Sequence, residues 1–268
     1  MSAPVRLVAT DLDGTLLGAG GRVGRRTRDA LHAARDAGVL VVPVTGRPPE
    51  GMWPVITGCA LGPLGVCSNG AVLVDVEARA VLEVVRIGAE VASRLVGVLR
   101  QVVPGILLAS DNLDGFVYER GFFPGPVDWE DRLTEVDDIA PATLGGCVKL
   151  VARRAGWSAP DLVATLQSEL AEEAHVTTSG LDWVDVGLLG ITKAYALDRL
   201  CDRLEVSVAE VVAVGDNHND LPVLGWAGTA MAPANAIPEV LAMVDRVLPA
   251  NTDDGVAVLL EELAGRRA

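Results

Sequence analysis

The feature that most constrains this chain is a hexapeptide near its start, DLDGTL at residues 11–16, directly after the apolar run 5–10. Such a run is typical of a buried strand, and an extended chain points residues two apart to the same side. Asp11 and Asp13 are therefore expected to face one reacting group. Paired carboxylates can divide a reaction, one attacking and one moving a proton, and they attract hard cations such as Mg²⁺. The alternative is a plain Asp-Gly turn of a hairpin.

Three more apolar runs end in polar or glycine-containing loops. Residues 39–44 lead into Thr45-Gly46-Arg47, residues 64–67 into Ser68-Asn69-Gly70, and residues 208–214 into GDNHND at 215–220. Helical patterns at 27–37 and 192–203 separate them. Fully apolar strands alternating with helices predict an α/β fold with a doubly wound, Rossmann-like parallel sheet. Ligands of such sheets bind beyond the carboxyl ends of the strands.

The middle of the chain follows a different pattern. Residues 82–187 contain helix-strand-strand twice, with helices at 89–103 and 160–173. This order predicts a small α+β domain inserted into the α/β domain. We therefore expect a catalytic core from residues 1–81 and 188–268, and an inserted cap domain from residues 82–187.

The charge balance limits the partners. The 268 residues carry 36 acidic and 22 basic side chains, for a net charge of −14, which disfavours nucleic acid and anionic membranes. A phosphate site must then be made positive locally, by a metal, a few cations and helix N-termini. Four cysteines without a CxxC pair and three histidines indicate neither a zinc site nor disulfides. Without a leader or a membrane span, we expect a cytoplasmic protein.

A strand followed by DxDGT resembles the signature of the haloacid dehalogenase superfamily, and further motifs follow in the family's order. Thr45 with Gly46-Arg47 is similar to motif two of the Cof-type branch, Lys193 to motif three, and GDNHND to motif four. Ser68-Asn69-Gly70, Asn235-Ala236 and DDGVA at 253–257 also resemble that branch. The insertion between motifs two and three is similar to its type II α/β cap.

The resemblance implies a role for each motif. Asp11 would attack phosphorus and form an aspartyl-phosphate, while Asp13 would protonate the leaving oxygen and later deprotonate water. Thr45 and Lys193 would hold phosphoryl oxygens. Asp11, Asp216 and the Asp13 backbone carbonyl would bind Mg²⁺. Members that break carbon–halogen bonds lack the second aspartate, so its presence here favours phosphoryl transfer.

Other residues are expected in lesser roles. Gly46, Arg47, Asn69 and Asn219 are predicted to contact substrate or phosphate, with a turn as the alternative for Arg47 and Asn69. Asp220 is predicted to support the site by pairing with Lys193, and His218 to be a bystander. Whether Asn235 reaches the site is open, because two extra residues precede it relative to the branch pattern. By position, Asp111, Asn112, Glu119 and Arg120 are candidates to contact the leaving group, and Trp129 and Trp183 are candidates to stack on a sugar. For any single one of them, the preferred interpretation is a turn, an exposed sheet face or a core aromatic.

The leading hypothesis is a Mg²⁺-dependent phosphomonoesterase for a small phosphorylated metabolite, with a sugar phosphate favoured. One alternative is a sugar phosphomutase, which would return an isomerised sugar phosphate instead of inorganic phosphate. Another is a catalytically idle binding protein on the same fold. That reading predicts a damaged catalytic residue, and all five principal ones are present. A monomer is the default expectation, and a dimer is possible.

Overall fold

The computed structural model describes residues 4–123 and 132–265, so Trp129 lies outside the described residues. The chain divides into two compact units. The core unit comprises Met1–Glu83 and Thr192–Ala268, and the inserted unit comprises Val84–Ile191.

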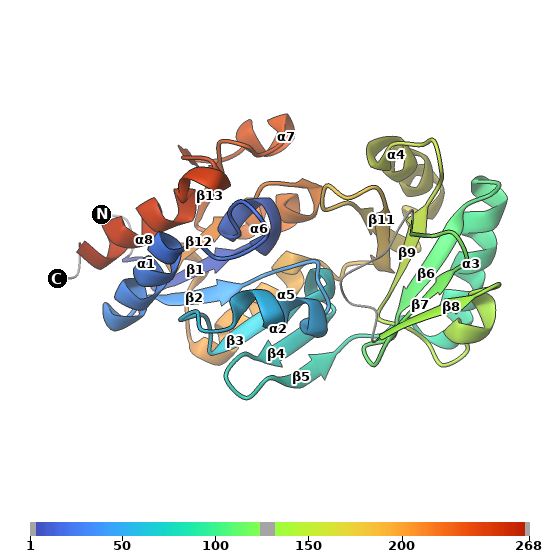
Figure 1. Ribbon diagram of the computed structural model, residues 1–268, viewed down its shortest axis with the longest axis horizontal. Helices are drawn as coiled ribbons and strands as arrows, with labels where there is room; N and C mark the ends of the chain where they lie inside the picture. The colour runs from blue at the N-terminus through green and yellow to red at the C-terminus, as the bar shows by residue number, and fades with distance from the viewer. Residues whose placement is uncertain (1–3, 124–131, 266–268) are drawn as a thin grey trace. The chain divides into compact units, whose positions relative to one another are not determined.

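A five-stranded parallel sheet forms the centre of the core unit, in the order β14-β13-β12-β1-β2 (Figure 1). Leu7 at the start of β1 pairs with Val211 of β12 and Leu40 of β2. These strands are nearly continuous apolar runs because both faces are covered. The predicted doubly wound α/β core is confirmed. The strands are β1 (Leu7–Thr10), β2 (Leu40–Pro43), β12 (Val211–Val214), β13 (Thr229–Pro233) and β14 (Arg246–Leu248).

Helices cover both faces of this sheet. Leu7 and Ala9 point to one face, where they join a buried cluster that includes Leu197 and Leu200 of α5. The residue between them, Val8, points to the opposite face, and α1 packs against α8 (Figure 1). The helices are α1 (Arg25–Asp36), α2 (Pro49–Ile56), α5 (Lys193–Leu204), α6 (Leu221–Trp226), α7 (Pro238–Leu241) and α8 (Gly255–Gly265).

Strand β3 (Leu64–Cys67) extends the core beyond β2. A parallel bridge joins Val44 to Val66, and the chain then turns back through β4 (Val72–Asp75) and β5 (Ala80–Val84). Strands β3 and β4 are antiparallel, and the turn that joins them, Ser68–Gly70, lies just past the carboxyl end of β3. The order β3-β4-β5 was not foreseen as a separate small sheet.

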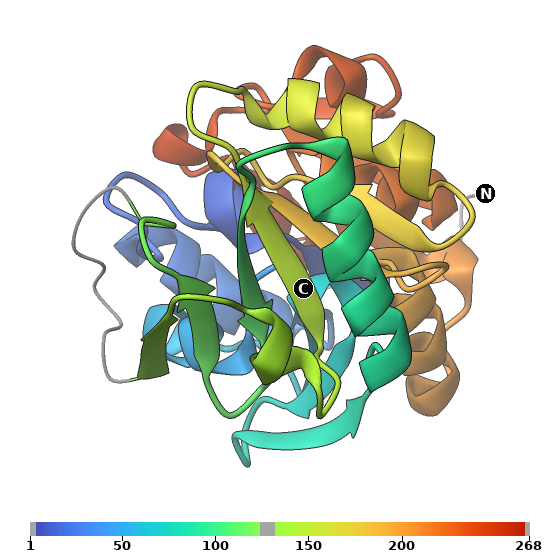
Figure 2. The same cartoon turned by 90° about the vertical axis from the view of Figure 1, so that its right-hand side faces the viewer.

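The inserted unit is a six-stranded sheet in the order β10-β11-β9-β6-β7-β8. Its pairings are antiparallel except β7 with β8. Helices α3 (Ala89–Val102) and α4 (Ala159–Leu170) lie on the viewer's side of these strands in Figure 2 and bury their leucines against them. The strands are β6 (Leu107–Asp111), β7 (Phe116–Glu119), β8 (Leu133–Val136), β9 (Lys149–Arg153), β10 (Ala174–Thr177) and β11 (Val184–Leu188).

Several of the positional candidates in the cap have structural roles within the inserted unit, the interpretation preferred for each of them from the sequence. The buried carboxylate of Glu119 accepts hydrogen bonds from the backbone N–H groups of Leu108 (3.0 Å) and Ile139 (3.1 Å), and it pairs with Arg100. These contacts join β7 to its neighbours, so Glu119 braces the sheet. Trp183 packs against Phe122 in an aromatic cluster.

The remaining cap candidates form local contacts. The carboxylate of Asp111 accepts from the N–H of Leu113 at 3.0 Å, and the side chain of Asn112 accepts from the Ser110 hydroxyl at 2.7 Å. Arg120 pairs with the exposed Asp137.

Across residues 4–123 and 132–265, we find no helix with the length and apolar character needed to cross a bilayer.

Candidate active site

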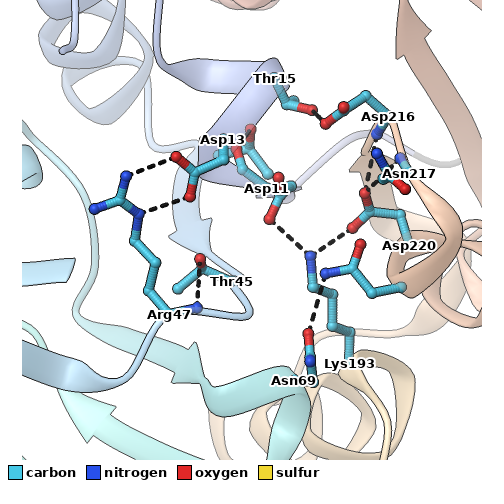
Figure 3. Close-up of polar contacts among 12 residues, drawn as sticks. Asp11, Asp13, Thr15, Thr45, Arg47, Asn69, Lys193, Asp216, Asn217 and Asp220 are labelled. Atoms are coloured by element: carbon cyan, nitrogen blue, oxygen red, sulfur yellow. Dashed lines mark hydrogen bonds and ion pairs between the residues drawn. The ribbon is translucent and has the colours of Figure 1, made fainter. Parts of the chain in front are cut away.

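The carboxyl ends of three adjacent parallel strands bring the motifs of the core unit together. Asp11 follows β1, Thr45 follows β2 and Asp216 follows β12 (Figure 3). The ladder continues past the strand ends, because the Asp11 N–H donates to the Val214 carbonyl at 2.9 Å. Helix α5 begins at Lys193, with the Thr192 side chain accepting from the N–H of Tyr195 as its cap. The edge of one sheet and one helix start thus define the site.

Lys193 is the centre of the site. Its ammonium donates to Asp11 Oδ1 at 2.7 Å and to Asp220 Oδ1 at 2.6 Å, and its side chain is fully buried. Burial by itself would lower the pKa of Lys193, but the two carboxylates raise it instead. The lysine is therefore held charged against the nucleophile position predicted for Asp11.

Asp220 fills its remaining acceptor positions with backbone donors. Its Oδ2 accepts from the N–H groups of Asp216 at 2.9 Å and Asn217 at 3.0 Å. With Lys193 on the other oxygen, this carboxylate shapes the loop after β12 and holds the lysine. The pairing of Asp220 with Lys193 that the sequence predicts is present in the geometry.

Asp216 is positioned by the DLDGTL segment. The Thr15 hydroxyl donates to Asp216 Oδ1 at 2.6 Å. The other carboxylate oxygen lies against Gly14, where a Cβ would come within 2.4 Å of Oδ2. Gly14 also has a φ of +77°, which favours glycine. The glycine of the motif thus lets the backbone approach the carboxylate.

This cluster has the composition of a cation site. Oxygens of Asp11, Asp216 and Asp220 lie within 4.8 Å of one another. Burial, followed by repulsion from Asp220, raises the pKa of Asp216 to about 7. Burial likewise raises the pKa of Asp11 well above its ordinary value, although Lys193 opposes the shift. Carboxylate oxygens crowded in this way fit a hard divalent cation.

Two further observations support that fit. With Asp13 included, the site has four carboxylates against the two cations Lys193 and Arg47, a formal charge of −4 + 2 = −2. In the described residues, the buried Oδ1 of Asn219 accepts no hydrogen bond. A divalent cation would balance the charge, and its hydration shell offers donors for such an oxygen.

Asp13 faces a different partner from Asp11. The backbone is extended at both Asp11 and Asp13, as the sequence predicts, and it turns at Gly14, whose φ is +77°. Arg47 donates from Nε and Nη2 to the two oxygens of Asp13, both at 2.6 Å, and from Nη1 to the Gly51 carbonyl at 2.9 Å (Figure 3). Arg47, predicted to contact phosphate, contacts Asp13 in this structure.

The turn after β3 approaches the loop after β2. The Asn69 N–H donates to the Thr45 carbonyl at 3.1 Å, and Asn69 Oδ1 accepts from Asn219 Nδ2 at 3.0 Å. Ser68 and Asn69 both have positive φ angles, 48° and 55°, which is strained for residues other than glycine. A Cβ on Gly46 would lie 2.9 Å from Asn69 Oδ1, so Gly46 permits this approach.

Two site residues were missed or left open by the sequence. Thr15 belongs to the quoted motif, but nothing in its position marked it as a partner of Asp216. Asn235 does reach the site's backbone: Nδ2 donates to the Gly14 carbonyl at 2.8 Å, and Oδ1 accepts from the Asn251 N–H at 2.9 Å. The Asn-Ala pair at 235–236 was its signal, and the extra residues before it lie in β13 and the turn that follows.

Comparison with known proteins gives a consistent result. The sequence profile of haloacid dehalogenase-like hydrolases matches residues 8–260. The pyridoxal phosphate phosphatase YbhA of Escherichia coli (strain K12) is 30% identical over 264 residues, 94% of this chain and 96% of the relative. An HMP-PP phosphatase of Yersinia pseudotuberculosis (serotype O:1b, strain IP 31758) is 30% identical over 244 residues, 88% of this chain and 86% of the relative.

Solved structures share the whole architecture. The protein SMU.1108c of Streptococcus mutans UA159 superimposes with a TM-score of 0.85 over 97% of this chain and 99% of that one, at 21% identity. At this identity the likeness concerns the fold, which includes both the core sheet and the inserted unit.

Gly14→Ala tests the approach of the motif glycine to Asp216. We expect the substitution to weaken divalent-cation binding by at least about tenfold, because the new methyl group displaces Asp216. Gly20→Ala is the matched control, since Gly20 has a similar φ of +79° but open space around its Cβ position. Gly20→Ala should lower the unfolding free energy by about 1–2 kcal/mol, the cost of a left-handed conformation at alanine, and leave the cation affinity unchanged. Equal cation affinities in the two variants, measured by calorimetric titration, would refute the steric account.

Proposed function

The chain belongs to the haloacid dehalogenase-like hydrolase family, and on that premise we propose a Mg²⁺-dependent phosphomonoesterase that works through an aspartyl-phosphate on Asp11. The observation that carries the proposal is the placement of Asp11. Its Oδ1 is held by the buried Lys193 ammonium, which leaves the other oxygen for attack. The relatives are named for small phosphorylated compounds, and we propose a substrate of that class.

The first half-reaction forms the bond between Asp11 and phosphorus. An Asp11 oxygen attacks, the bond from phosphorus to the leaving oxygen breaks, and Asp13 supplies the proton that the leaving oxygen takes up. The Thr45 hydroxyl and Lys193 ammonium stabilise the equatorial phosphoryl oxygens. In the second half-reaction Asp13 removes a proton from water, water oxygen bonds to phosphorus, and Asp11 leaves as a carboxylate.

Asp11, Asp216 and the Asp13 backbone carbonyl would hold the cation. Mg²⁺ bound there supplies positive charge that offsets repulsion between a carboxylate nucleophile and an anionic phosphate. The remaining residues keep these groups in place. Thr15 orients the Asp216 carboxylate, and Asp220 holds the lysine at the nucleophile.

Arg47 is assigned to Asp13 and not to the phosphate. The guanidinium group binds both Asp13 oxygens, and its third contact, to the Gly51 carbonyl, anchors it to α2. Bidentate pairing of this kind fixes the orientation of a carboxylate as well as its location. Arg47 therefore positions the group that moves the proton.

The substrate is identified by a phosphate-release screen in the presence of Mg²⁺. Two relatives at the same 30% identity have different names, so neither compound transfers directly to this chain. The panel consists of sugar phosphates, pyridoxal phosphate and HMP-PP. Release of inorganic phosphate supports a phosphatase, whereas an isomerised sugar phosphate without phosphate release would identify a mutase.

Asp11→Asn should reduce phosphate release by at least about a thousandfold, because an amide is a poor nucleophile. Steady-state assays on the best substrate of the screen measure the loss. Asp36→Asn, at an exposed position in α1, removes the same charge outside the site and should retain activity. Turnover that survives in Asp11→Asn would exclude the covalent route.

Asp13→Asn should lower kcat/KM for an alkyl phosphate by about 10²–10⁴-fold and for an activated aryl phosphate far less, since an activated leaving group needs no acid. Arg47→Lys keeps the charge but loses the bidentate contact. It should therefore also lower kcat/KM more for the alkyl phosphate than for the aryl phosphate, by a smaller factor than Asp13→Asn. If Arg47→Lys slowed both substrates equally, the arginine would act on the phosphate instead.

Stability without metal should depend on pH through Asp216. Its folded-state pKa of about 7 exceeds the ordinary 3.8, so the folded protein holds a proton that the unfolded chain releases. The metal-free protein should therefore lose stability as the pH rises from 3.8 to about 7. Mg²⁺ should raise the thermal midpoint more at about pH 7.5 than at about pH 5.5. In Asp216→Asn this pH-dependent gain should disappear; a gain of the wild-type size would contradict the assignment.

A further inference from the structure

The core unit contains a cavity of about 470 Å³ that the candidate active site does not use. Its walls come from the end of α1, the start of β2, the segment after α2 and the turn between β4 and β5. These segments lie at the amino ends of β2 and β3, whereas the candidate active site lies at the carboxyl ends of the strands. The volume is within the range of small-molecule sites, roughly 300–1,000 Å³.

Part of the wall of this cavity is apolar, and the wall carries one large aromatic group. Val39, Val41 and Leu61 are buried residues of its wall, and Trp53 of α2 lines it while half-buried. An indole ring offers a flat surface on which a planar ring can stack. Cys59 also lines the cavity and is the least buried of the four cysteines, all of which the structure describes.

The rim of the cavity carries the charged residues Arg35, Arg79 and Glu77. Arg35 pairs with Asp36 at 3.8 Å, so Arg79 is the cation of the rim that a ligand can use. Arg79 has a φ of 51°, and its Nη2 donates to the Thr57 hydroxyl at 3.0 Å. Thr57 in turn donates to the Trp53 carbonyl at 2.7 Å. Arg79 is thus tied to the wall that carries the indole.

Arg79 retains charge for a ligand. Within residues 4–123 and 132–265 it forms no ion pair with a carboxylate, and the Thr57 contact uses one of its five N–H groups. A guanidinium group at the rim of a partly apolar cavity suits a phosphate, sulfonate or carboxylate group. The aromatic wall suits a planar ring and the guanidinium at the rim suits an anionic group, so a ligand with both parts fits the cavity.

We propose that this cavity is a second binding site, for a small aromatic anion whose ring lies against Trp53 and whose charged group meets Arg79. The site is separate from the proposed catalytic function and does not depend on it. Strand β2 runs from the cavity to the candidate active site, since Val41 lies in the cavity wall and Thr45 follows the carboxyl end of the strand.

Anilinonaphthalene sulfonate is a suitable probe, because it combines a planar ring with an anionic group that a phosphatase does not hydrolyse. Occupancy is read at Cys59 as protection from iodoacetamide, followed by peptide mass spectrometry. Burial raises the pKa of the Cys59 thiol, an effect that Arg28 partly offsets, so the labelling is done under alkaline conditions. The other three cysteines are buried and serve as internal references.

The site predicts saturable protection of Cys59 by the probe, in the wild type and equally in Asp11→Asn. Arg79→Met should lower the affinity for the probe by about tenfold or more, because one charge-assisted contact is lost. The control Arg25→Met removes the same charge from a highly exposed position of α1 and should leave affinity unchanged. Neutral phenylnaphthylamine should protect Cys59 less well.

Two results would overturn the proposal. One is unprotected Cys59 at saturating probe, which would place any bound probe elsewhere. The other is equal affinity in Arg79→Met and Arg25→Met, both checked for folding by thermal unfolding. Because Asp11→Asn enters the binding assay, loss of the proposed catalytic function leaves this test intact.

Discussion

The contact on which the rest of this structure depends is the buried ammonium of Lys193 between Asp11 and Asp220. A fully buried charge is stable only when it is paired and hydrogen-bonded, and this lysine finds partners 182 and 27 residues away in the chain. The loop after β1, the start of α5 and the loop after β12 must therefore meet at one point. The parallel sheet makes that possible, because β1 and β12 are neighbours and end at the same edge. One ion-paired triad thus ties together the parts that precede and follow the inserted unit.

The site keeps negative charge close together and uses local backbone geometry to do so. Gly14 lets the chain pass against Asp216, and Gly215 lets it pass against Asp220, where a Cβ would lie 2.4 Å from the carboxylate carbon. Ser68 and Asn69 hold left-handed conformations next to the loop of Thr45. Strain and crowded carboxylates both cost stability, and they are concentrated at the edge of the sheet where we propose the reaction.

Much of the fold follows from pattern. The apolar runs before Asp11, Thr45 and Asp216 predicted the parallel core, because only a sheet covered on both faces makes continuous apolar strands. The order of the motifs likewise predicted that these residues and Lys193 would converge, and the structure brings them together. Their roles in catalysis stay a proposal.

Side-chain direction was beyond the reach of the sequence. Asp11 pairs with Lys193, whereas Asp13, two residues further along an extended backbone, pairs with Arg47. Glu119 was a candidate for the leaving group by position, with an exposed sheet face among the preferred alternatives, but it is buried and accepts from N–H groups of neighbouring segments. Strand β8 was missed because it is a short edge strand with alternating polar residues. Such contacts are long-range, and no local pattern records them.

The central claim is that Asp11 becomes phosphorylated, and chemical trapping tests it most directly. In Asp13→Asn an activated aryl phosphate should still phosphorylate the enzyme, while the second step lacks its base, so the intermediate accumulates. Quenching this variant and reducing it with borohydride converts an acyl-phosphate to homoserine, which peptide mass spectrometry locates. The account predicts a burst of one aryl alcohol per enzyme and homoserine at position 11. A burst with an unmodified Asp11, or with the modification at another residue, would contradict it.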